Sequence, residues 1–521
     1  MPARAVVLLP DREFPFPGNL ALEEGERRLT YAELDRDTAG VAARLLGGRA
    51  DLAEERVAFL VAPGLDYARV QRGIWRAGGI AVPLCTAHPP PELDYVLGDA
   101  APSIVVASAE HAERLRPLAA ARGIALVATG DLMDEPARPE AARAGSSGAA
   151  PETRSLPRLE PRRRAMIVYT SGTTGGPKGV VATHANLRAQ MESLLDAWSW
   201  TPRDRILLTL PLHHVHGIVN VLGCALAAGA ACVLHAGFDA RRVWEAFGRD
   251  RLTLYMGVPT MYYRLIEAWD DAGAAERAAW SAAAGGLRLM VSGSAALPAS
   301  VLARWREITG HVLLERYGMT ETGMILSNPL AGERVPGAVG TPLPGVEVRL
   351  VDERGAALDG DAEGEVWVRG PAVFHEYWRR PEATAGAFAG DWFRTGDVAR
   401  RSGAVYRLLG RSSVDIIKTG GYKVSALEIE EALRAHPGVA DCAVVGLADE
   451  EWGERVAAAV VPAAAGTVPT AEDLRRFIKE RLASYKAPRQ VLVVAALPRN
   501  VLGKVEKPRV KELFAAARQE R

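Results

Sequence analysis

The sequence has few of the features that mark a disulfide-stabilised, metal-binding or polyanion-binding protein. Only four cysteines occur in 521 residues. They form no CxxC pair, and this spacing predicts neither a zinc site nor a disulfide framework. Lys plus Arg and Asp plus Glu both number 63, so the formal net charge is zero and no nucleic-acid partner is expected. Local motifs are therefore a better guide to function than bulk composition.

Long hydrophobic runs are also scarce. The N-terminal apolar run is too short for a secretory signal. Residues 217–234 are nearly uncharged, but they are rich in Ala and Gly and include Asn220, which favours a buried helix running into a strand over a membrane span. We expect a cytoplasmic protein, monomeric or dimeric, that binds neither membranes nor nucleic acid.

Short β-type runs alternate with helical segments over most of the chain, which predicts an α/β fold of sheets covered by helices. We expect a large N-terminal domain over residues 1–410. Within it, residues 134–164 form a surface linker rich in Ala, Pro, Arg and Gly, and residues 337–410 form a small antiparallel, barrel-like subdomain. A small α+β C-terminal domain follows at 411–521, and its single connection leaves it free to rotate.

The segment YTSGTTGGPKGV, Tyr169 to Val180, predicts a loop that binds phosphate. Its glycines let the backbone bend tightly around an anion, and Lys178 adds a positive charge. Pro177 precedes this lysine and no hydroxyl residue follows it, so the loop differs from a P-loop. The alternative is an ordinary flexible turn. The other residues predicted to contact the phosphates of ATP are Thr170, Ser171, Gly172, Thr173, Thr174 and Gly175.

Two later motifs also suit a nucleotide. In ERYGMTETGM (315–324), Tyr317 can stack on adenine, Thr320 can donate to the α-phosphate and Glu321 can hold Mg²⁺. Gly318 allows the backbone to pass close to the nucleotide. In VSGSAAL (291–297), a strand leads into a turn of small residues whose backbone can approach a base or ribose closely. An ordinary strand-to-helix turn is the alternative there.

These motifs form an ordered set with PLHHVHG (211–217), WFRTGDVA (392–399), YRLLGR (406–411) and PRNVLGKVEK (498–507). The set resembles the acyl-adenylate-forming superfamily, which includes acyl-CoA synthetases, over almost the whole chain. The resemblance implies two steps. A carboxylate first attacks the α-phosphate of ATP to give acyl-AMP and pyrophosphate. The C-terminal domain then rotates and the thiol of CoA attacks the acyl-AMP. ATP, Mg²⁺ and CoA are therefore expected.

The resemblance also implies roles for single residues. Lys504 would be the catalytic lysine, supported by Lys178, Thr320 and Glu321. Asp397 would hold the ribose hydroxyls, and Arg411 would brace the ribose or a phosphate. Ser413 stands where the family often has Asp or Lys, which leaves the identity of the hinge residue open. Further nucleotide contacts are implied for Gly293, Ser294, Ala295, Glu315 and Met319, and a wall of the CoA tunnel for Gly420, Gly421 and Tyr422.

Within the superfamily, MGVPTMYYRL (256–265), ERYGMTETGM and LPLHHVHG look like segments of malonyl-CoA synthetases. Malonate keeps a second carboxylate while the first reacts, and arginine binds such an anion with bidentate geometry. Arg316 and Arg264 are therefore the predicted ligands of this carboxylate. By resemblance, His214 borders the acyl pocket. A surface position for Arg264 and a role in the fold for Arg316 are the alternatives.

The resulting prediction is an AMP-forming malonate–CoA ligase that also accepts methylmalonate. One alternative within the class is an acyl-CoA synthetase for another short- or medium-chain acid. Another is a stand-alone adenylation enzyme that loads a phosphopantetheine carrier protein, although the sequence contains no visible carrier domain of its own.

Overall fold

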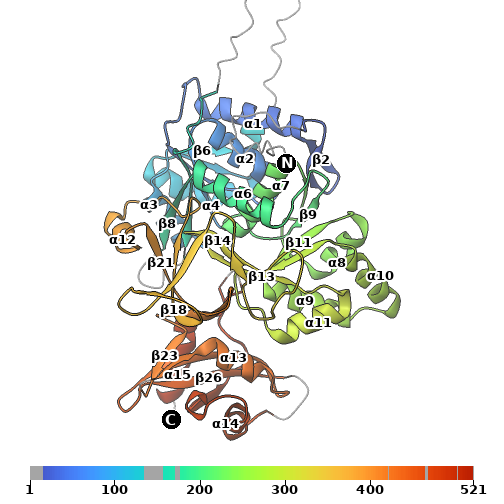
Figure 1. The fold of residues 1–521 in the computed structure, drawn as a ribbon. Helices are drawn as coiled ribbons and strands as arrows, with labels where there is room; N and C mark the ends of the chain where they lie inside the picture. Colours follow the sequence, from blue (N-terminus) through green and yellow to red (C-terminus); the bar gives the residue numbers. More distant parts are fainter. Residues whose placement is uncertain are drawn as a thin grey trace, which may run out of the picture.

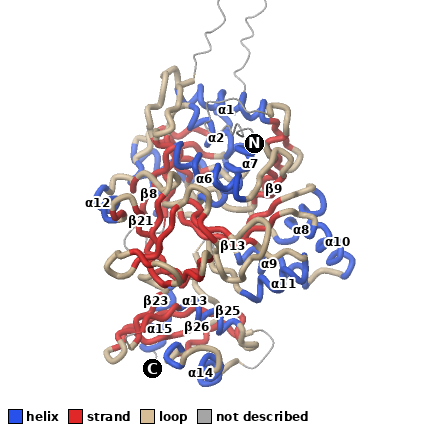
Figure 2. Tube along the Cα trace, in the orientation of Figure 1, coloured by secondary structure: helices blue, strands red, loops and turns tan. Residues whose placement is uncertain are grey.

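The structure of the chain is a computed structural model that describes residues 16–133, 156–170, 177–420, 422–463, 468–500 and 503–519. The N-terminal sheets and their helices form the upper body, and the C-terminal elements form a smaller unit below it (Figure 1). Helices α1 (Tyr31–Leu46) and α10 (Ala274–Gly285) lie on the outside of the upper body, whereas β13 (Leu314–Met319) runs through its middle (Figure 2). The predicted α/β class is confirmed, including the antiparallel barrel-like sheet and the C-terminal α+β unit.

The largest sheet has nine strands. In sheet order these are β15 (Thr341–Pro342), β14 (Gly323–Ser327), β13 (Leu314–Met319), β12 (Leu289–Ser292), β11 (Leu254–Gly257), β9 (Arg205–Leu208), β10 (Ala231–Leu234), β1 (Leu20–Glu24) and β2 (Arg27–Thr30). Every neighbouring pair from β13 to β1 is parallel. The carboxyl ends of β9, β11, β12 and β13 therefore meet at one edge of the sheet.

A second sheet of seven strands carries the predicted phosphate loop. Its strands are β19 (Glu376–Tyr377), β8 (Lys178–Thr183), β7 (Arg164–Thr170), β4 (Ile80–Pro83), β3 (Arg56–Leu60), β5 (Ile104–Ala107) and β6 (Ala125–Ala128). β7 and β8 are antiparallel, and Thr170 pairs with Lys178 at the base of the loop. Antiparallel β19 covers β8 on its other side.

The third sheet is antiparallel and contains β17 (Ala357–Leu358), β16 (Glu347–Val351), β18 (Ala362–Arg369), β21 (Trp392–Ser402) and β20 (Phe388–Ala389), with β22 (Val405–Arg411) also paired to β21. The C-terminal sheet contains β24 (Tyr422–Ser425), β23 (Ile416–Thr419), β26 (Gly453–Pro462) and β25 (Val439–Asp449), with β27 (Gln490–Val493) beside β26. Only the short segment between Arg411 and Ile416 separates these two sheets in the sequence. The predicted boundary after residue 410 falls next to this segment and stays a prediction.

Some of the helices start at residues whose side chains cap them. Thr30 and Glu33 form a capping box before the first helix, and the hydroxyl of Ser425 accepts a bond from the Glu428 N–H. The N-terminal helices are α1 (Tyr31–Leu46), α2 (Leu65–Arg76), α3 (Pro90–Ala100), α4 (Ala109–Arg122), α5 (Thr129–Met133), α6 (His184–Ala197), the π-helix η1 (His216–Gly223), α7 (Cys224–Ala228), α8 (Ala240–Arg249), α9 (Pro259–Asp270), α10 (Ala274–Gly285), α11 (Ala299–Thr309) and α12 (Pro381–Gly386). The C-terminal helices are α13 (Ala426–Arg434), α14 (Ala471–Lys479), the 3₁₀-helix η2 (Ser484–Lys486) and α15 (Lys507–Gln519).

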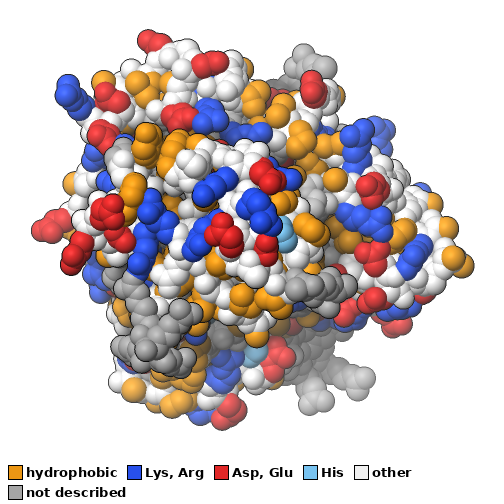
Figure 3. Space-filling view, turned by 90° about the horizontal axis from the view of Figure 1, so that it is seen from below, with side chains coloured by type: hydrophobic (Ala, Val, Ile, Leu, Met, Phe, Trp, Pro, Cys, Tyr) orange, Lys and Arg blue, Asp and Glu red, His pale blue; other side chains and the backbone are white. Residues whose placement is uncertain are grey.

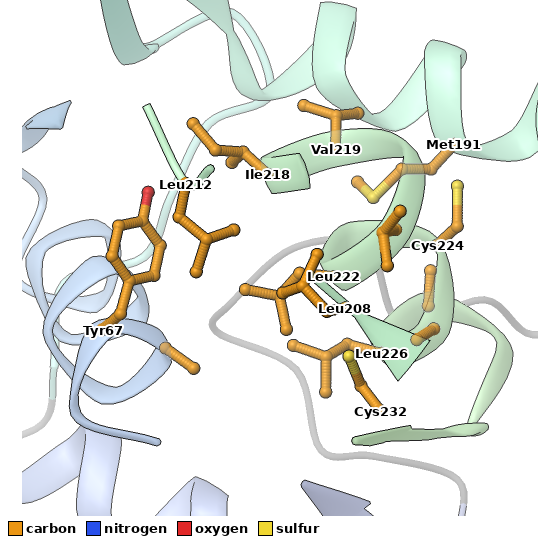
Figure 4. Packing of buried hydrophobic residues seen from close by; sticks show 14 of the residues in the cluster. Tyr67, Met191, Leu208, Leu212, Ile218, Val219, Leu222, Cys224, Leu226 and Cys232 are labelled. Atoms are coloured by element: carbon orange, nitrogen blue, oxygen red, sulfur yellow. The ribbon is translucent and has the colours of Figure 1, made fainter. Parts of the chain in front are cut away.

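The main core lies where η1 and α7 pack between α6 and the nine-stranded sheet. Figure 4 shows Met191, Val219, Leu222 and Leu208 meeting there. Residues 217–234 form a buried helical segment followed by β10, as predicted. Among the described residues, no helix is both long and apolar enough to cross a membrane. All four cysteines are buried and free.

The surface seen from below carries Lys and Arg interspersed with Asp and Glu (Figure 3). This mixture on that face agrees with the zero net charge of the chain. Part of the predicted linker, residues 134–155, lies outside the described residues, whereas residues 156–163 lead directly into β7.

Candidate active site

The site lies at the carboxyl edge of the nine-stranded sheet. The histidine segment follows β9, the turn of small residues follows β12, and Thr320 and Glu321 follow β13. Parallel strands place their carboxyl ends at a common edge, which is where ligands bind in open α/β sheets. The sheet thus brings together motifs that are far apart in the sequence.

A buried carboxylate, Asp397, stands at the centre of one group of polar residues. The Tyr317 hydroxyl donates to its Oδ2 at 2.5 Å, and Arg411 Nε donates to its Oδ1 at 3.0 Å. β21 and β22 set this geometry because they pair Asp397 directly with Arg411. Burial raises the pKa of the Tyr317 phenol, as do the charge and hydrogen bond of Asp397. The tyrosine therefore stays a neutral donor.

A second carboxylate, Glu321, is held by a tyrosine that connects it to the phosphate loop. The Tyr377 hydroxyl donates to Glu321 Oε1 at 2.9 Å. Lys178 Nζ lies 5.0 Å from the centroid of the same tyrosine ring, within the range of a cation–π contact. Burial raises the pKa of Glu321, while Tyr377 and Arg411 oppose that rise.

The C-terminal unit contributes Lys504 to this site. Its surroundings lower the lysine pKa, first by desolvation and then through the positive charges of Arg411 and Arg316, while Asp397 acts in the opposite sense. The residue as a whole is exposed, although desolvation is the largest cause of the lowered pKa of its amine. Gly503, next to it, approaches Thr260 of α9, because a Cβ on the glycine would lie 3.1 Å from the threonine hydroxyl.

Arg316 is the most unusual cation of the site. Arg316 is only 4% exposed. Its Nε and Nη2 are buried without a hydrogen-bond partner among the described residues. Burial lowers its pKa to about 10, so the guanidinium is still charged at neutral pH. A buried charge without a partner is costly unless a ligand neutralises it. Arg316 therefore has the character of a binding site for an anion.

Histidines extend from the surface toward this arginine. The rings of His213 and His214 lie 4.3 Å apart, and His213 lies 6.2 Å from His88. Burial lowers the pKa of His213 to about 4 and that of His214 well below its ordinary value, and nearby Lys504 lowers the latter further. His216 lies beside Arg316, and its Nδ1 is 3.3 Å from the Ser294 hydroxyl. The neutral rings of His213, His214 and His216 border the site without adding charge.

Two backbone features shape the site. Ser294 adopts a left-handed φ of 70°, a conformation that is uncommon for a residue with a side chain and that clusters at functional turns. Gly293 lies against Arg316, since a Cβ there would come within 2.5 Å of the guanidinium Cζ. Gly318 similarly approaches the backbone of Gly323. Both glycines are thus needed for close packing.

The charges of the site favour anions. Four cations, namely Lys178, Arg316, Arg411 and Lys504, come from separate segments. They face two carboxylates, Asp397 and Glu321. An excess of positive charge suits a polyphosphate and a carboxylic acid, which repel each other in water.

Several predicted residues have other environments. Arg264 is exposed on α9, whereas Tyr262 and Leu265 on either side of it are buried. The helix therefore directs Arg264 outward, away from the buried setting of Arg316, and the expectation that the two arginines share one pocket is not met. The Glu315 carboxylate accepts the Gly337 N–H at 2.7 Å, and burial raises its pKa to about 7. Its contact with the nucleotide stays a prediction.

The predicted CoA-tunnel residues lie on a different part of the C-terminal unit. Tyr422 is 54% exposed, and its ring stacks on Tyr485 with centroids 4.2 Å apart. Gly420 packs against the Trp452 ring. Six loop positions and one tunnel position lie outside the described residues, namely Ser171, Gly172, Thr173, Thr174, Gly175 and Gly176 and, in the tunnel, Gly421.

The sequence analysis missed two residues of the site. Tyr377 joins Glu321 to the phosphate loop only because β19 pairs with β8, which sets Tyr377 opposite Val180. Tyr262 lies near Arg316, and its hydroxyl donates to the Val291 carbonyl at 2.8 Å. Tyr262 could have been found from the sequence, because it directly follows GVPTM and lies two residues before Arg264.

Known families explain this constellation. Residues 11–378 match the model of AMP-binding enzymes, and residues 428–504 match the model of the C-terminal domain of these enzymes. The chain belongs to the AMP-binding enzyme family. The nucleotide motifs up to residue 324 lie within the first match, and Lys504 is the last residue of the second.

Among the relatives of this AMP-binding enzyme are several curated malonate–CoA ligases. The mitochondrial malonate–CoA ligase ACSF3 of Mus musculus is 45% identical, with 98% of this chain and 91% of the relative covered. The Homo sapiens protein of the same name is 44% identical, with 95% and 90% covered. The malonate–CoA ligase of Arabidopsis thaliana is 39% identical, with 92% and 81% covered.

Solved structures agree with the fold. ATP-bound MatB from Rhodopseudomonas palustris is 35% identical and has a TM-score of 0.85, with 96% of this chain and 97% of that chain covered. A malonyl-CoA ligase complex with methylmalonyl-CoA and AMP is 39% identical but has a TM-score of 0.67, with 95% and 100% covered. The overall arrangement of this AMP-binding enzyme is thus more similar to the ATP-bound structure than to that product complex.

Proposed function

We propose that this AMP-binding enzyme is an AMP-forming malonate–CoA ligase. It converts malonate, ATP and CoA to malonyl-CoA, AMP and diphosphate through a malonyl-adenylate, and methylmalonate is a second substrate. ATP and CoA are the co-substrates expected for a CoA ligase of this family. The observation that supports the choice of acid most strongly is the buried Arg316, whose guanidinium has unused donors beside the nucleotide motif.

The second carboxylate of malonate explains why such an arginine is useful. A monocarboxylic acid would leave the buried guanidinium without a partner, whereas malonate can accept from Nε and Nη2 together. Malonate has a single carbon between its carboxyl groups, so its other carboxylate stays within a short distance of Arg316. Lys504 also lies near Arg316. This proximity favours a short diacid, and His214 is proposed to border it.

In the first step, the free carboxylate of malonate attacks the α-phosphorus of ATP, and pyrophosphate leaves. We assign Lys504 to the α-phosphate and the attacking carboxylate, where its ammonium offsets the charge that develops. Asp397 would bind the ribose hydroxyls, since a carboxylate accepts two hydrogen bonds. Arg411 would either turn from Asp397 toward a phosphate or keep its hydrogen bond to Asp397 and hold that carboxylate in place. Thr320, Tyr317 and the turn containing Gly293 and Ser294 line the same edge of the sheet.

The residues present also fit Mg²⁺. Glu321 is a buried carboxylate with one oxygen held by Tyr377, and Mg²⁺ usually takes one or two carboxylates together with phosphate oxygens and water. When bound, the ion would neutralise phosphate charge. We expect Glu321→Gln to raise the Mg²⁺ concentration needed for half-maximal activity, and an unchanged Mg²⁺ dependence would remove Glu321 from this role.

In the second step, the CoA thiol attacks the malonyl carbonyl and AMP leaves. The position of Lys504 near Arg411, with Gly420 and Tyr422 elsewhere on the C-terminal unit, supports the assignment of this arrangement to adenylation. We propose that the C-terminal unit then rotates about the segment between Arg411 and Ile416, which brings Gly420 and Tyr422 to the CoA path.

The test is formation of acyl-CoA and AMP from ATP, Mg²⁺ and CoA with acetate, butyrate, octanoate, malonate and methylmalonate. The expected result is equimolar malonyl-CoA and AMP, with the two diacids far ahead of the monocarboxylates. Preference for a monocarboxylate would leave the ligase class intact but exclude malonate as the substrate. Adenylate formation without CoA turnover would indicate a carrier-loading enzyme instead. Size-exclusion chromatography and cell fractionation would test the proposed monomeric or dimeric state and cytoplasmic location.

A further inference from the structure

The loop that carries Lys504 is bounded by two charged residues. Arg499 precedes the lysine and Lys507, the first residue of α15, follows it. Between them, the Asn500 N–H donates to the Lys504 carbonyl at 2.9 Å, and the Lys504 N–H donates to Asn500 Oδ1 at 3.0 Å. These bonds shape the loop itself but do not fix its place on the C-terminal unit.

Arg499 and Lys507 both belong to one continuous series of ion pairs, which we call the charge network. Arg499 pairs with Asp441, and Arg434 links Asp441 to Glu430 at 3.7 and 3.4 Å. Lys507 Nζ then lies 2.8 Å from Glu430 Oε1 and 2.6 Å from Asp415 Oδ1. The network thus begins on one side of the Lys504 loop and returns to it on the other.

The part of the charge network around Lys507 is buried. Lys507 and Glu430 are 7% and 4% exposed, and Glu430 Oε1 also accepts the Val444 N–H at 2.8 Å. Burial alone lowers the pKa of Lys507, but the charges of Glu430 and Asp415 outweigh it and the pKa is raised. A buried ion pair adds little net stability compared with apolar residues, and its best attested use is to select one geometry.

Asp415 extends the network to the nucleotide residues. Its Oδ2 accepts the backbone N–H of Arg411 at 3.0 Å, and the Arg411 side chain is bonded to Asp397. Gly410 packs against Asp415 with φ +119°, and a Cβ there would lie 2.3 Å from the Asp415 Cβ. The network therefore reaches the last strand of the barrel-like sheet through the segment that joins it to the C-terminal unit.

We propose that the charge network is the device that positions Lys504 for adenylation, with Lys507 as its central positioning residue. A set of ion pairs that only stabilised the C-terminal unit would not need to contact both flanks of the Lys504 loop and the backbone of Arg411. The inference rests on the proposed function for the role of Lys504 in adenylation and for malonate as the acid. Its consequence is that the network matters for adenylation more than for thioester formation.

The test compares the two half-reactions in Lys507→Met. Malonate-dependent ATP–pyrophosphate exchange measures adenylation, and malonyl-CoA formation from chemically prepared malonyl-adenylate and CoA measures the second step. We expect exchange to fall by about tenfold or more, since a displacement near 1 Å has effects of this size, and the second step to change little. Lys507→Arg should restore most of the exchange. Lys511→Met, on the same helix, is the matched control.

Equal losses in both half-reactions, or no loss in either, would overturn the proposal. If Lys507→Met does not fold, Arg499→Met gives the same test from the more exposed end of the network, with the same selective loss expected and the same results contradicting it. Failure of the proposed function would appear differently, because the unaltered enzyme would then show no exchange with malonate.

Discussion

At the scale of single residues, we propose that Lys504 and Arg316 act on different carboxylates of the acid. Both lie in one electrostatic neighbourhood, yet Arg316 is buried within the N-terminal body whereas Lys504 arrives on the C-terminal unit. A fixed cation suits the carboxylate that does not react. A cation that can leave suits the one that does, because the CoA thiol must later approach the same carbon.

Lys504→Ala tests the second half of this division. Without the Lys504 ammonium, no positive charge at that position stabilises the charge that develops between the carboxylate and the α-phosphate. Adenylation should therefore fall by roughly 100-fold or more. Malonyl-CoA formation from supplied malonyl-adenylate should persist. Pyrophosphate exchange and a direct thioester assay measure the two steps, and Lys479→Ala on α14, an exposed lysine of the same unit, is the control. Full exchange activity in Lys504→Ala would refute its role.

Residue roles could be predicted from the sequence only where a motif fixes the local geometry. The placement of Arg316 is an example, because strand alternation turns it away from Glu315 and Tyr317. The motif alone does not show which way the side chain of Arg264 points. Helical periodicity could have indicated that Arg264 is exposed, because Tyr262 and Leu265 favour burial of the helix face that carries them. Tyr377 could not be predicted, because its position depends on pairing between β19 and β8 across the sequence.

At the scale of elements, the turn after β12 shapes the floor under Arg316. Gly293 lies against the guanidinium so closely that a methyl group would displace it. We expect Gly293→Ala to lower kcat/KM for malonate by about tenfold or more, as a small displacement of a binding group is enough to do so. Gly237→Ala, where a Cβ meets no atom within 4 Å, should have no effect.

A double-mutant comparison tests whether Gly293→Ala acts by moving Arg316. If Gly293→Ala acts by moving Arg316, it should cost little more in an Arg316→Leu background, since the displaced group is already gone. Fully additive losses in the double variant would show instead that the turn acts on the nucleotide or on the fold.

The order of the elements was largely predictable, but their convergence was not. Alternating periodicity indicates parallel sheets, and a parallel sheet brings the ends of β9, β11, β12 and β13 together. The sequence does not say which sheet lies beside which. The contact between the seven-stranded sheet and the edge of the larger sheet, made by Tyr377 of β19 and Glu321, required the structure.

At the scale of the whole molecule, buried histidines make stability depend on pH. Burial lowers the pKa of His184 to about 4, while in the unfolded chain it returns to its ordinary value of 6.5. The unfolded state therefore takes up the proton first as the pH falls. The contribution of His184 is complete above pH 6.5 and is lost as the pH falls toward 4, by up to about 3 kcal/mol.

Thermal unfolding followed between pH 7.5 and 4.5 measures this effect. His184→Gln should flatten the loss of Tm on the acid side relative to the unaltered enzyme, even if its Tm at pH 7.5 is lower. The exposed histidine variant His375→Gln should follow the unaltered curve. An unchanged slope in His184→Gln would mean that other groups dominate acid unfolding.

The proposed mechanism uses both parts of the molecule, and the proposed specificity for malonate depends on the buried charge of Arg316. The most direct test is kcat/KM for malonate and for butyrate in the unaltered enzyme and in Arg316→Leu. We predict a fall of about 100-fold or more for malonate, as expected when one member of a buried charge pair is removed, with butyrate unchanged or improved. An equal fall for both acids would contradict the account and assign Arg316 to the nucleotide or the fold.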